Sequence, residues 1–152
     1  MPVLHLICGL PGSGKTTLAK QLERDLPALR LAPDEWMARI VGDGHDEEKR
    51  SAVEAIQWDI AARALRLGVD VILENGFWSR QERDDIRSRA TALGADTRLH
   101  FLDVPRDELL RRLAQRNAAL PSDTFPVSDA QLNLWSTWFE PPTPDEIGET
   151  PI

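Results

Sequence analysis

One segment limits the possible folds of this chain more than any other feature. Residues 9–16 read Gly-Leu-Pro-Gly-Ser-Gly-Lys-Thr, a full match to the phosphate-binding loop pattern G-x-x-x-x-G-K-[ST]. An apolar, strand-favouring run at 3–8 precedes the loop, and a helix-like stretch at 15–26 follows it. A phosphate-binding loop needs this strand-loop-helix context. The sequence therefore predicts a nucleoside triphosphate site between the first strand and the first helix.

Each residue type in the loop has a mechanical reason. The glycines let the backbone curl, so that successive N–H groups and the helix N-terminus point at phosphate oxygens. Lys15 reaches the β- and γ-phosphates, and the Thr16 hydroxyl is a ligand for Mg²⁺. The residues expected to contact ATP here are Gly9, Pro11, Gly12, Ser13, Gly14, Lys15, Thr16 and Thr17.

Length and charge limit the organisation of the chain and its partners. The 152 residues are enough for one domain, 1–152, and too few for two. Acidic residues outnumber basic ones, 25 against 18, for a net charge of −7. Proteins that bind a nucleic-acid backbone usually present a basic face, so nucleic acid is a disfavoured partner.

Several absences indicate where the protein works. No apolar run approaches the roughly 18 residues of a membrane span, and the first residues already read as a strand rather than a signal peptide. The single Cys8 cannot form an internal disulfide. We therefore expect a cytoplasmic protein with no membrane partner. The sequence does not indicate its oligomeric state.

Apolar runs alternate with helical patterns along the chain, which is typical of βα units and a parallel sheet. Strands are expected at 3–8, 28–32, 69–74 and 97–103. Helices are expected at 15–26, 34–41, 47–67, between Ser79 and Gly94, at 105–117 and at 128–139, with an irregular tail after 139. Together with the phosphate loop, this predicts a three-layer α/β/α P-loop NTPase with strand order 2-3-1-4. A fifth strand either lies in the last few residues or is missing.

Three features favour phosphoryl transfer over a signalling role. The chain has no N-K-x-D motif for guanine, so ATP is the expected nucleotide. An arginine-bearing helix after the fourth strand suits a kinase lid, over about 105–127. Asp34 follows the second strand, and ligands of parallel sheets bind beyond the carboxyl ends of the strands, so Asp34 should face the phosphate loop.

Three segments between residues 9 and 117 resemble a known family. They read Gly-Leu-Pro-Gly-Ser-Gly-Lys-Thr-Thr, Pro-Asp-Glu-Trp and Leu-Asp-Val-Pro-Arg-Asp-Glu-Leu-Leu-Arg-Arg-Leu-Ala-Gln-Arg-Asn. The set is similar to small AAA-type ATP-binding proteins of the P-loop kinase superfamily, whose relatives include polynucleotide kinase domains, chloramphenicol phosphotransferase, gluconate kinase and zeta toxins. This resemblance implies that Asp34 is a general base. It also implies that Arg112 and Arg116 are lid arginines that neutralise the transferring phosphoryl group, Arg116 contacting the nucleotide as well.

Other roles for these residues stay open. Asp34 also suits a helix N-cap, and Arg112 and Arg116, one turn apart, also suit a solvated helix face. Met37 stands where polynucleotide kinases carry an arginine that helps to hold the acceptor. This departure adds to the argument against a nucleic-acid acceptor.

Two acidic residues compete for the metal site, because each ends an apolar strand. Glu74 should lie nearer the phosphates, since its strand neighbours the first strand in the expected order. A glutamate at this place indicates either a water-mediated Mg²⁺ contact or a substrate contact. Asp103 resembles the family's Asp-Val-Pro turn before the lid helix, where capping is the expected role.

The sequence thus predicts an ATP- and Mg²⁺-dependent kinase whose acceptor is the hydroxyl group of a small molecule. A polynucleotide or nucleotide 5′-hydroxyl kinase is one alternative, and an ATPase or nucleotide-binding switch that transfers phosphate only to water is another. Trp36, Phe77 and Trp78 follow strand ends on the ligand side, either as walls of an acceptor pocket or as partly buried surface aromatics. The identity of the acceptor cannot be read from the sequence.

Overall fold

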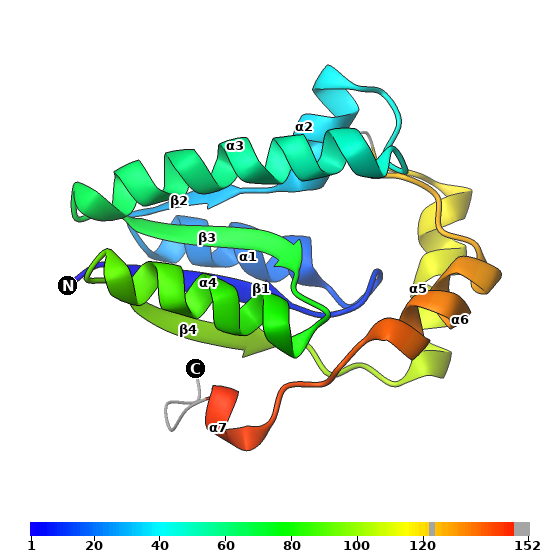
Figure 1. The fold of residues 1–152 in the computed structure, drawn as a ribbon. Helices are drawn as coiled ribbons and strands as arrows, with labels where there is room; N and C mark the ends of the chain where they lie inside the picture. The colour runs from blue at the N-terminus through cyan, green and yellow to red at the C-terminus, as the bar shows by residue number, and fades with distance from the viewer. Residues whose placement is uncertain (122–123, 148–152) are drawn as a thin grey trace.

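A computed structural model describes residues 1–121 and 124–147 of the chain, and Figure 1 shows how its elements are arranged. The strands are β1 (Val3–Cys8), β2 (Ala28–Leu31), β3 (Asp70–Gly76) and β4 (Asp96–Phe101). The helices are α1 (Lys15–Asp25), α2 (Pro33–Ile40), α3 (Glu47–Arg66), α4 (Arg80–Ala92), α5 (Arg106–Ala118), α6 (Asp129–Trp138) and α7 (Pro144–Ile147).

The sheet is parallel throughout and has the order β2-β3-β1-β4. At its centre Leu6 of β1 lies between Leu73 of β3 and Leu99 of β4. This confirms the prediction of a P-loop NTPase fold with strand order 2-3-1-4. The described part of the chain contains four strands. The last residues, 148–152, where a fifth strand was considered, lie outside it.

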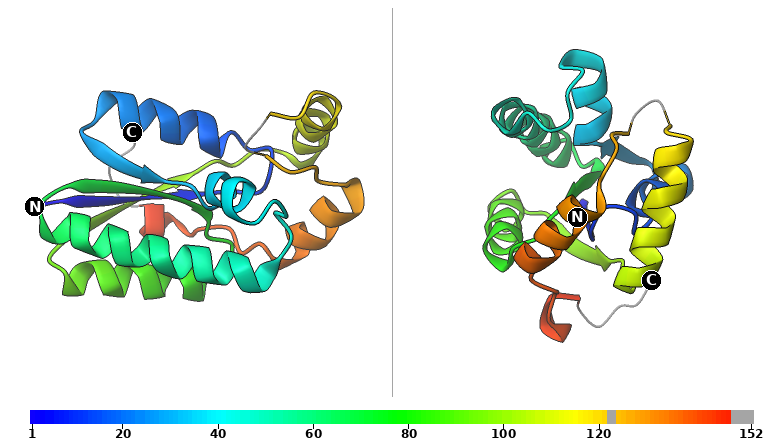
Figure 2. Two further views of the ribbon diagram at one scale, coloured as in Figure 1. Left: turned by 90° about the horizontal axis from the view of Figure 1, so that it is seen from above. Right: turned by 90° about the vertical axis from the view of Figure 1, so that its right-hand side faces the viewer.

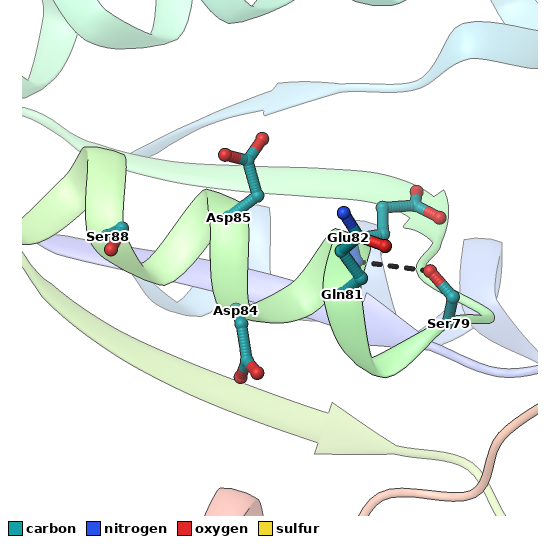
Figure 3. A pocket seen from close by; sticks show the side chains of 6 residues that line it. All are labelled: Ser79, Gln81, Glu82, Asp84, Asp85 and Ser88. Atoms are coloured by element: carbon teal, nitrogen blue, oxygen red, sulfur yellow. Dashed lines mark hydrogen bonds between the residues drawn. The ribbon is translucent and has the colours of Figure 1, made fainter.

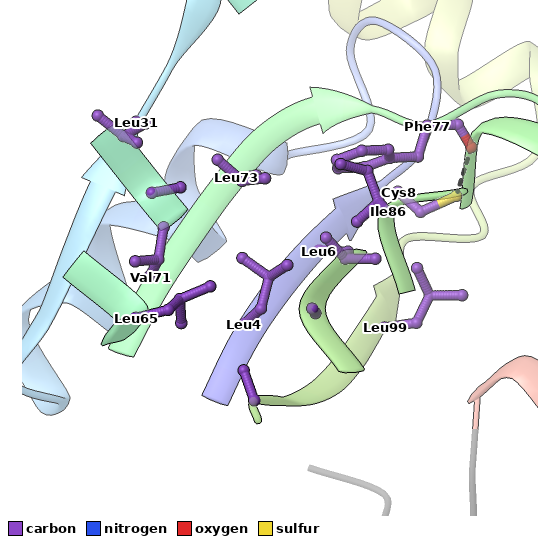
Figure 4. Close-up of a cluster of buried hydrophobic side chains, with 13 residues drawn as sticks. Leu4, Leu6, Cys8, Leu31, Leu65, Val71, Leu73, Phe77, Ile86 and Leu99 are labelled. Carbon is purple, nitrogen blue, oxygen red and sulfur yellow. Dashed lines mark hydrogen bonds between the residues drawn. The ribbon is translucent and has the colours of Figure 1, made fainter. Parts of the chain in front are cut away.

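Helices cover both faces of the sheet and make three layers. Helix α1 lies on one face, and α3 and α4 lie side by side on the other (Figure 2). Alternate residues of β1 serve the two layers, because successive strand side chains point to opposite faces. Leu4 and Leu6 pack in the cluster that includes residues of α3 and α4 (Figure 4), while Ile7 packs with α1.

Helices α5 and α6 lie across the carboxyl ends of the strands (Figure 1). Their buried apolar residues form a separate cluster, which includes Leu109, Leu113 and Leu132. Leu10 of the phosphate loop packs against this cluster. The segment expected to form a lid therefore rests directly on the loop that it would cover. Within the described ranges, no helix has both the length and the apolar character needed to cross a bilayer.

The tail differs from the expectation of an irregular segment, because it contains the short helix α7 beside β4 (Figure 1). A buried ion pair holds this helix: Glu146 accepts a 2.8 Å hydrogen bond from Nε of Arg83, and both side chains are almost completely buried. Arg83 also donates to the carbonyl oxygen of Phe77 at 2.8 Å, and Phe77 has a left-handed backbone with φ of 50°. Arg80 and Arg87 add ion pairs to Glu146. The ion pairs join distant segments and leave no local pattern. Thr143-Pro144-Asp145-Glu146 is nevertheless a local helix-start signal, and Thr143 N donates a 2.9 Å hydrogen bond to the Glu146 carboxylate.

Two buried histidines give the fold a dependence on pH. Nδ1 of His5 on β1 lies 2.9 Å from Nε2 of His100 on β4, so one imidazole donates a hydrogen bond and the other must stay neutral to accept it. Burial lowers the pKa of His100 to about 4, and the neighbouring His5 adds to the effect. Between its ordinary pKa of 6.5 and this value, the unfolded chain binds a proton that the folded chain does not. Stability contributed by His100 is therefore lost as pH falls through this window.

We expect the free energy of unfolding of the wild type to fall, relative to His100→Gln, by roughly 3 kcal/mol between pH 7 and pH 4. Urea unfolding of both proteins at each pH unit measures this difference. Carboxylates that titrate in the same range contribute equally to both proteins and cancel. Parallel curves for the two proteins would contradict the prediction.

Candidate active site

The phosphate loop joins β1 to α1 at the carboxyl edge of the sheet. Gly14, the N-cap of α1, has φ of 96°, a left-handed conformation that favours glycine. Nζ of Lys15 donates a 3.2 Å hydrogen bond to the carbonyl oxygen of Leu10, within the loop. Burial lowers the pKa of Lys15, while the negative charges of Asp34 and Glu74 act in the opposite direction. A loop lysine in this setting is placed to exchange the Leu10 carbonyl for a phosphate oxygen.

Glu74, at the end of β3, lies beside the loop as the expected strand order requires. One carboxylate oxygen accepts a hydrogen bond from the Thr16 hydroxyl, and the other lies 3.1 Å from Nε of Arg30 on β2. Arg30 also pairs with Glu35 at 2.5 Å, so the cation links the ends of β2 and β3. The Thr16 and Glu74 oxygens are hard donors of the kind that Mg²⁺ takes together with phosphates and water. Within residues 1–121 and 124–147, no cluster of three or more His, Cys, Asp or Glu side chains is arranged to hold a metal ion.

Asp34 lies in the first turn of α2, with its carboxylate half-exposed. The expected alternative role as an N-cap is wrong: Ala32 is the N-cap and no side chain caps this helix, because Pro33 occupies the first helical position. Instead, the Asp34 carboxylate accepts a 2.6 Å hydrogen bond from Arg50 of α3. Arg50 also donates to the carbonyl oxygen of Gly44 at 2.9 Å. The aspartate is thus fixed by a neighbouring helix rather than by its own.

The two arginines of α5 are turned toward the loop but reach different places. Nη1 of Arg112 lies 3.4 Å from the carbonyl oxygens of both Gly12 and Ser13, while its Nε pairs with Glu108. Nη2 of Arg116 donates to the carbonyl oxygen of Phe125 at 3.3 Å, and its buried Nε has no partner within the described residues. Burial lowers the pKa of Arg116, and the charge of Asp34 opposes this shift. Neither arginine lies on a freely solvated helix face.

Asp103 does not take the role expected for it. The N-cap of α5 is Pro105, without a side-chain capping bond, and Asp103 is an exposed residue in the turn before it. The proline ring fixes the backbone at the entry to α5, and the first N–H groups of the helix receive no side-chain capping bond from Asp103. Of the two acidic residues that competed for the metal site, Glu74 is the one beside Thr16.

Aromatic contacts close the site between segments far apart in the sequence. The ring of Trp135 on α6 lies 5.6 Å from that of Trp78 and 6.3 Å from that of His45, centroid to centroid. Gly44, next to His45, leaves room for the ring of Phe125, which a Cβ at this position would overlap. Nε1 of Trp78 donates to the carbonyl oxygen of Gly9 in the phosphate loop, at 3.2 Å. These contacts connect the α2–α3 loop, the lid and the phosphate loop.

The structure therefore gathers most of the expected site residues at one edge of the sheet. The charges of Asp34, Glu74 and Arg116 all act on the Lys15 ammonium group. Thr17 is exposed on α1, next to Thr16, whose hydroxyl is the expected ligand of Mg²⁺. No local pattern predicts Arg30, Arg50 or Phe125 as site residues, because ion pairs and contacts between distant segments have no local period. Trp36 packs against the main core cluster, and Phe77 is buried in it.

A model of the AAA domain matches residues 4–142 of the chain. The chain belongs to the AAA-domain family. The fold of this AAA-domain protein is that of a P-loop NTPase, as the phosphate loop indicated.

Three solved structures show how far the likeness of this AAA-domain protein extends. A chain of the Pnkp1/Rnl/Hen1 complex is 25% identical with a TM-score of 0.66, and the match covers 73% of our chain but only 38% of that one. Kti12 of Chaetomium thermophilum, in complex with ADP-AlF3, is 18% identical over 93% of our chain and 82% of that chain, with a TM-score of 0.71. The APS kinase CysC of Mycobacterium tuberculosis, in complex with AMPPNP and APS, is 23% identical over 79% and 73%, with a TM-score of 0.60. The last two show the fold alone.

Proposed function

We propose that this protein is an ATP-dependent kinase that transfers the γ-phosphoryl group to a hydroxyl of a small molecule. The observation that carries the proposal is the convergence of Lys15, Asp34 and Arg116, from three separate elements, at the carboxyl edge of the sheet. A phosphate-binding cation, a carboxylate base and a lid arginine are the parts that phosphoryl transfer needs. The AAA-domain family and a structural neighbour that is a kinase support the same reaction class.

Each side chain of the site has one role in the proposed phosphoryl transfer. Asp34 accepts the proton of the acceptor hydroxyl, whose oxygen forms a bond to the γ-phosphorus as the bond to the β-phosphate bridging oxygen breaks, leaving ADP. Lys15, Arg112 and Arg116 stabilise negative charge on the phosphoryl oxygens. Thr16 would hold Mg²⁺, and Glu74 would contact it through water because Arg30 already occupies one of its oxygens. Bound Mg²⁺ would supply further neutralisation of phosphate charge.

Two observations support a small molecule rather than a nucleic acid as acceptor. Met37 is completely buried, so the position equivalent to the acceptor-holding arginine of polynucleotide kinases offers neither charge nor exposed surface. The net charge of −7 also opposes binding to a phosphate backbone. We propose that residues 1–152 work as one unit, with 105–127 as the lid.

Transfer of radiolabelled γ-phosphate tests the function directly. The protein is incubated with ATP and Mg²⁺ alone, with fractionated small metabolites, and with 5′-hydroxyl oligonucleotides. Labelled product from a metabolite fraction supports the proposal. Label found only on the oligonucleotides would indicate a polynucleotide kinase, and label released only as inorganic phosphate would indicate an ATPase or switch.

Lys15→Ala should lower the affinity for ATP by roughly two to four powers of ten, because it removes about two charge-assisted hydrogen bonds of ~1.5–3 kcal/mol each. The fold should persist, since the ammonium group bonds only to the carbonyl oxygen of Leu10 within the described residues. Calorimetric titration with ATP measures the loss. Lys20→Ala, at an exposed position one turn further along α1, is the matched control. An unchanged affinity of Lys15→Ala for ATP would contradict the assignment of residues 9–16 as a phosphate-binding loop.

A further inference from the structure

A cavity of about 170 Å³ lies between α3 and α4, over the carboxyl end of β3. Its floor is apolar and includes Leu73, Phe77 and Ile86 of the main core (Figure 4). Trp58 of α3 adds an aromatic wall. Small-molecule sites typically combine such an apolar lining with a few polar groups.

The polar groups toward this cavity include three acceptors of hydrogen bonds. The side-chain oxygen of Asn75 is buried and has no hydrogen-bond partner among the described residues. Glu54 of α3 and Glu82 of α4 line the cavity from opposite helices. Figure 3 shows Glu82 and Asp85 on the side of α4 that faces α3, whereas Asp84 points the opposite way. A buried acceptor without a donor costs free energy, which a ligand with donors can restore.

The charges around the cavity are unbalanced. Burial, and after it the negative charge of Glu82, raise the pKa of Glu54 to about 7. Burial of the side chain likewise raises the pKa of Glu82. Arg50 pairs with Asp34 at 2.6 Å, outside the cavity. Arg89 lines the cavity, over the ring of Trp58, but pairs with Asp85 at 2.9 Å, so the two glutamates keep no cation of their own there among the described residues. A positive group between the two glutamates would stabilise both in their ionised forms.

The cavity is next to the expected reaction centre. Arg50, which fixes Asp34, lies one turn before Glu54 on α3, and the charge of Asp34 acts on Glu54. At the other side, Asn75 and Phe77 flank Gly76, whose carbonyl oxygen accepts a 3.0 Å hydrogen bond from Gly9 N of the phosphate loop. The cavity therefore borders α3, the helix whose Arg50 holds Asp34, and the end of β3, the strand that is hydrogen-bonded to the phosphate loop.

We propose that this cavity binds the phosphoryl acceptor, and that the acceptor is a hydroxyl-bearing amine whose ammonium group lies between Glu54 and Glu82. The inference rests on the proposed kinase function and adds the substrate class to it. The acceptor hydroxyl gives its proton to Asp34, its oxygen bonds to the γ-phosphorus of ATP, and ADP leaves. Asn75 accepts a hydrogen bond from the same ligand.

Matched pairs of probes that differ only in the amine test the proposal. Serinol is compared with glycerol, and glucosamine with glucose, by calorimetry on the protein loaded with Mg²⁺ and a non-hydrolysable ATP analogue. We expect the amine of at least one pair to bind about tenfold or more tightly than its neutral partner. Equal affinity within both pairs, tighter binding of the neutral members, or no binding of any probe would overturn the proposal.

Glu54→Gln keeps the shape of the side chain and removes its charge, so the preference for the amine should disappear while affinity for the ATP analogue stays unchanged. Glu48→Gln, at an exposed position of the same helix, is the control and should keep the preference. A preference retained in Glu54→Gln would overturn the proposal.

A transfer assay separates this inference from the kinase function. Amine binding without transfer of labelled phosphate would leave the cavity assignment standing and reject the kinase. Transfer to neutral alcohols alone would keep the kinase and reject the amine.

Discussion

Asp34→Asn should lower phosphoryl transfer by roughly 10²–10⁴-fold, the usual worth of a positioned acid–base group. The amide keeps the side-chain shape and an oxygen that can accept the hydrogen bond from Arg50, but it cannot take a proton. ATP should therefore bind nearly normally. Single-turnover transfer to the acceptor and calorimetric binding of ATP, on the same protein, measure the two quantities.

The structure removes the main competing explanation for such a loss. Because Asp34 does not cap α2, the change loses only a half-exposed ion pair and a first-turn charge, and denaturation by urea should show a loss of about 1 kcal/mol or less. Asp59→Asn, at an exposed position of α3, is the matched control and should keep full activity. Full transfer activity in Asp34→Asn would reject the catalytic assignment and leave an ATP-binding domain.

Arg116→Ala should lower turnover by roughly 10³–10⁵-fold, as expected for an arginine that stabilises charge in the transition state. Nucleotide affinity should change far less, because the ground-state phosphates are held by the loop and Lys15. The Nε of Arg116 is buried and has no hydrogen-bond partner in the described ranges, and a phosphoryl oxygen would satisfy it once the lid rearranges around the nucleotide. Steady-state turnover and ATP affinity, measured together, separate the two effects.

The same helix provides the control for this prediction. Arg111 is exposed and pairs with Glu108, so Arg111→Ala should leave turnover within a few-fold of the wild type. Arg116→Lys keeps a positive charge but loses the planar fork, and we expect it to recover only part of the activity. Turnover of Arg116→Ala within a few-fold of the wild type would reduce Arg116 to a structural residue that supports Phe125.

The sequence was sufficient for the fold because the decisive signals are local. The phosphate loop fixes the position of β1 and α1, and alternating apolar runs fix the other strands of a parallel sheet. The two incorrect capping predictions both lie near a proline. Pro33 is the first residue of α2 and Pro105 is the N-cap of α5, whereas capping had been predicted for Asp34 and Asp103.

The site was only partly predictable, because its remaining contacts join distant segments. Asp34, Glu74 and the α5 arginines follow strand ends, and parallel strands bring such positions together. Arg30 and Arg50, which hold the two acidic residues, depend on strand order and helix packing rather than on any motif. The contact of His45 with Trp135 likewise joins a turn to α6 and leaves no trace in the local sequence.

The buried pair between Arg83 and Glu146 has a consequence for biosynthesis. The guanidinium is fully buried in the finished fold, yet its carboxylate partner is translated 63 residues later. A buried charge without its partner costs about 3–5 kcal/mol. In a nascent chain that has not reached residue 146, packing α4 against the sheet would bury the Arg83 guanidinium at this cost. The loop at Phe77, which also receives a hydrogen bond from Arg83, shares this delay. We therefore expect α4 and the loop at Phe77 to reach their final packing only after α7 has been translated, although the phosphate-loop motif is among the first residues to emerge.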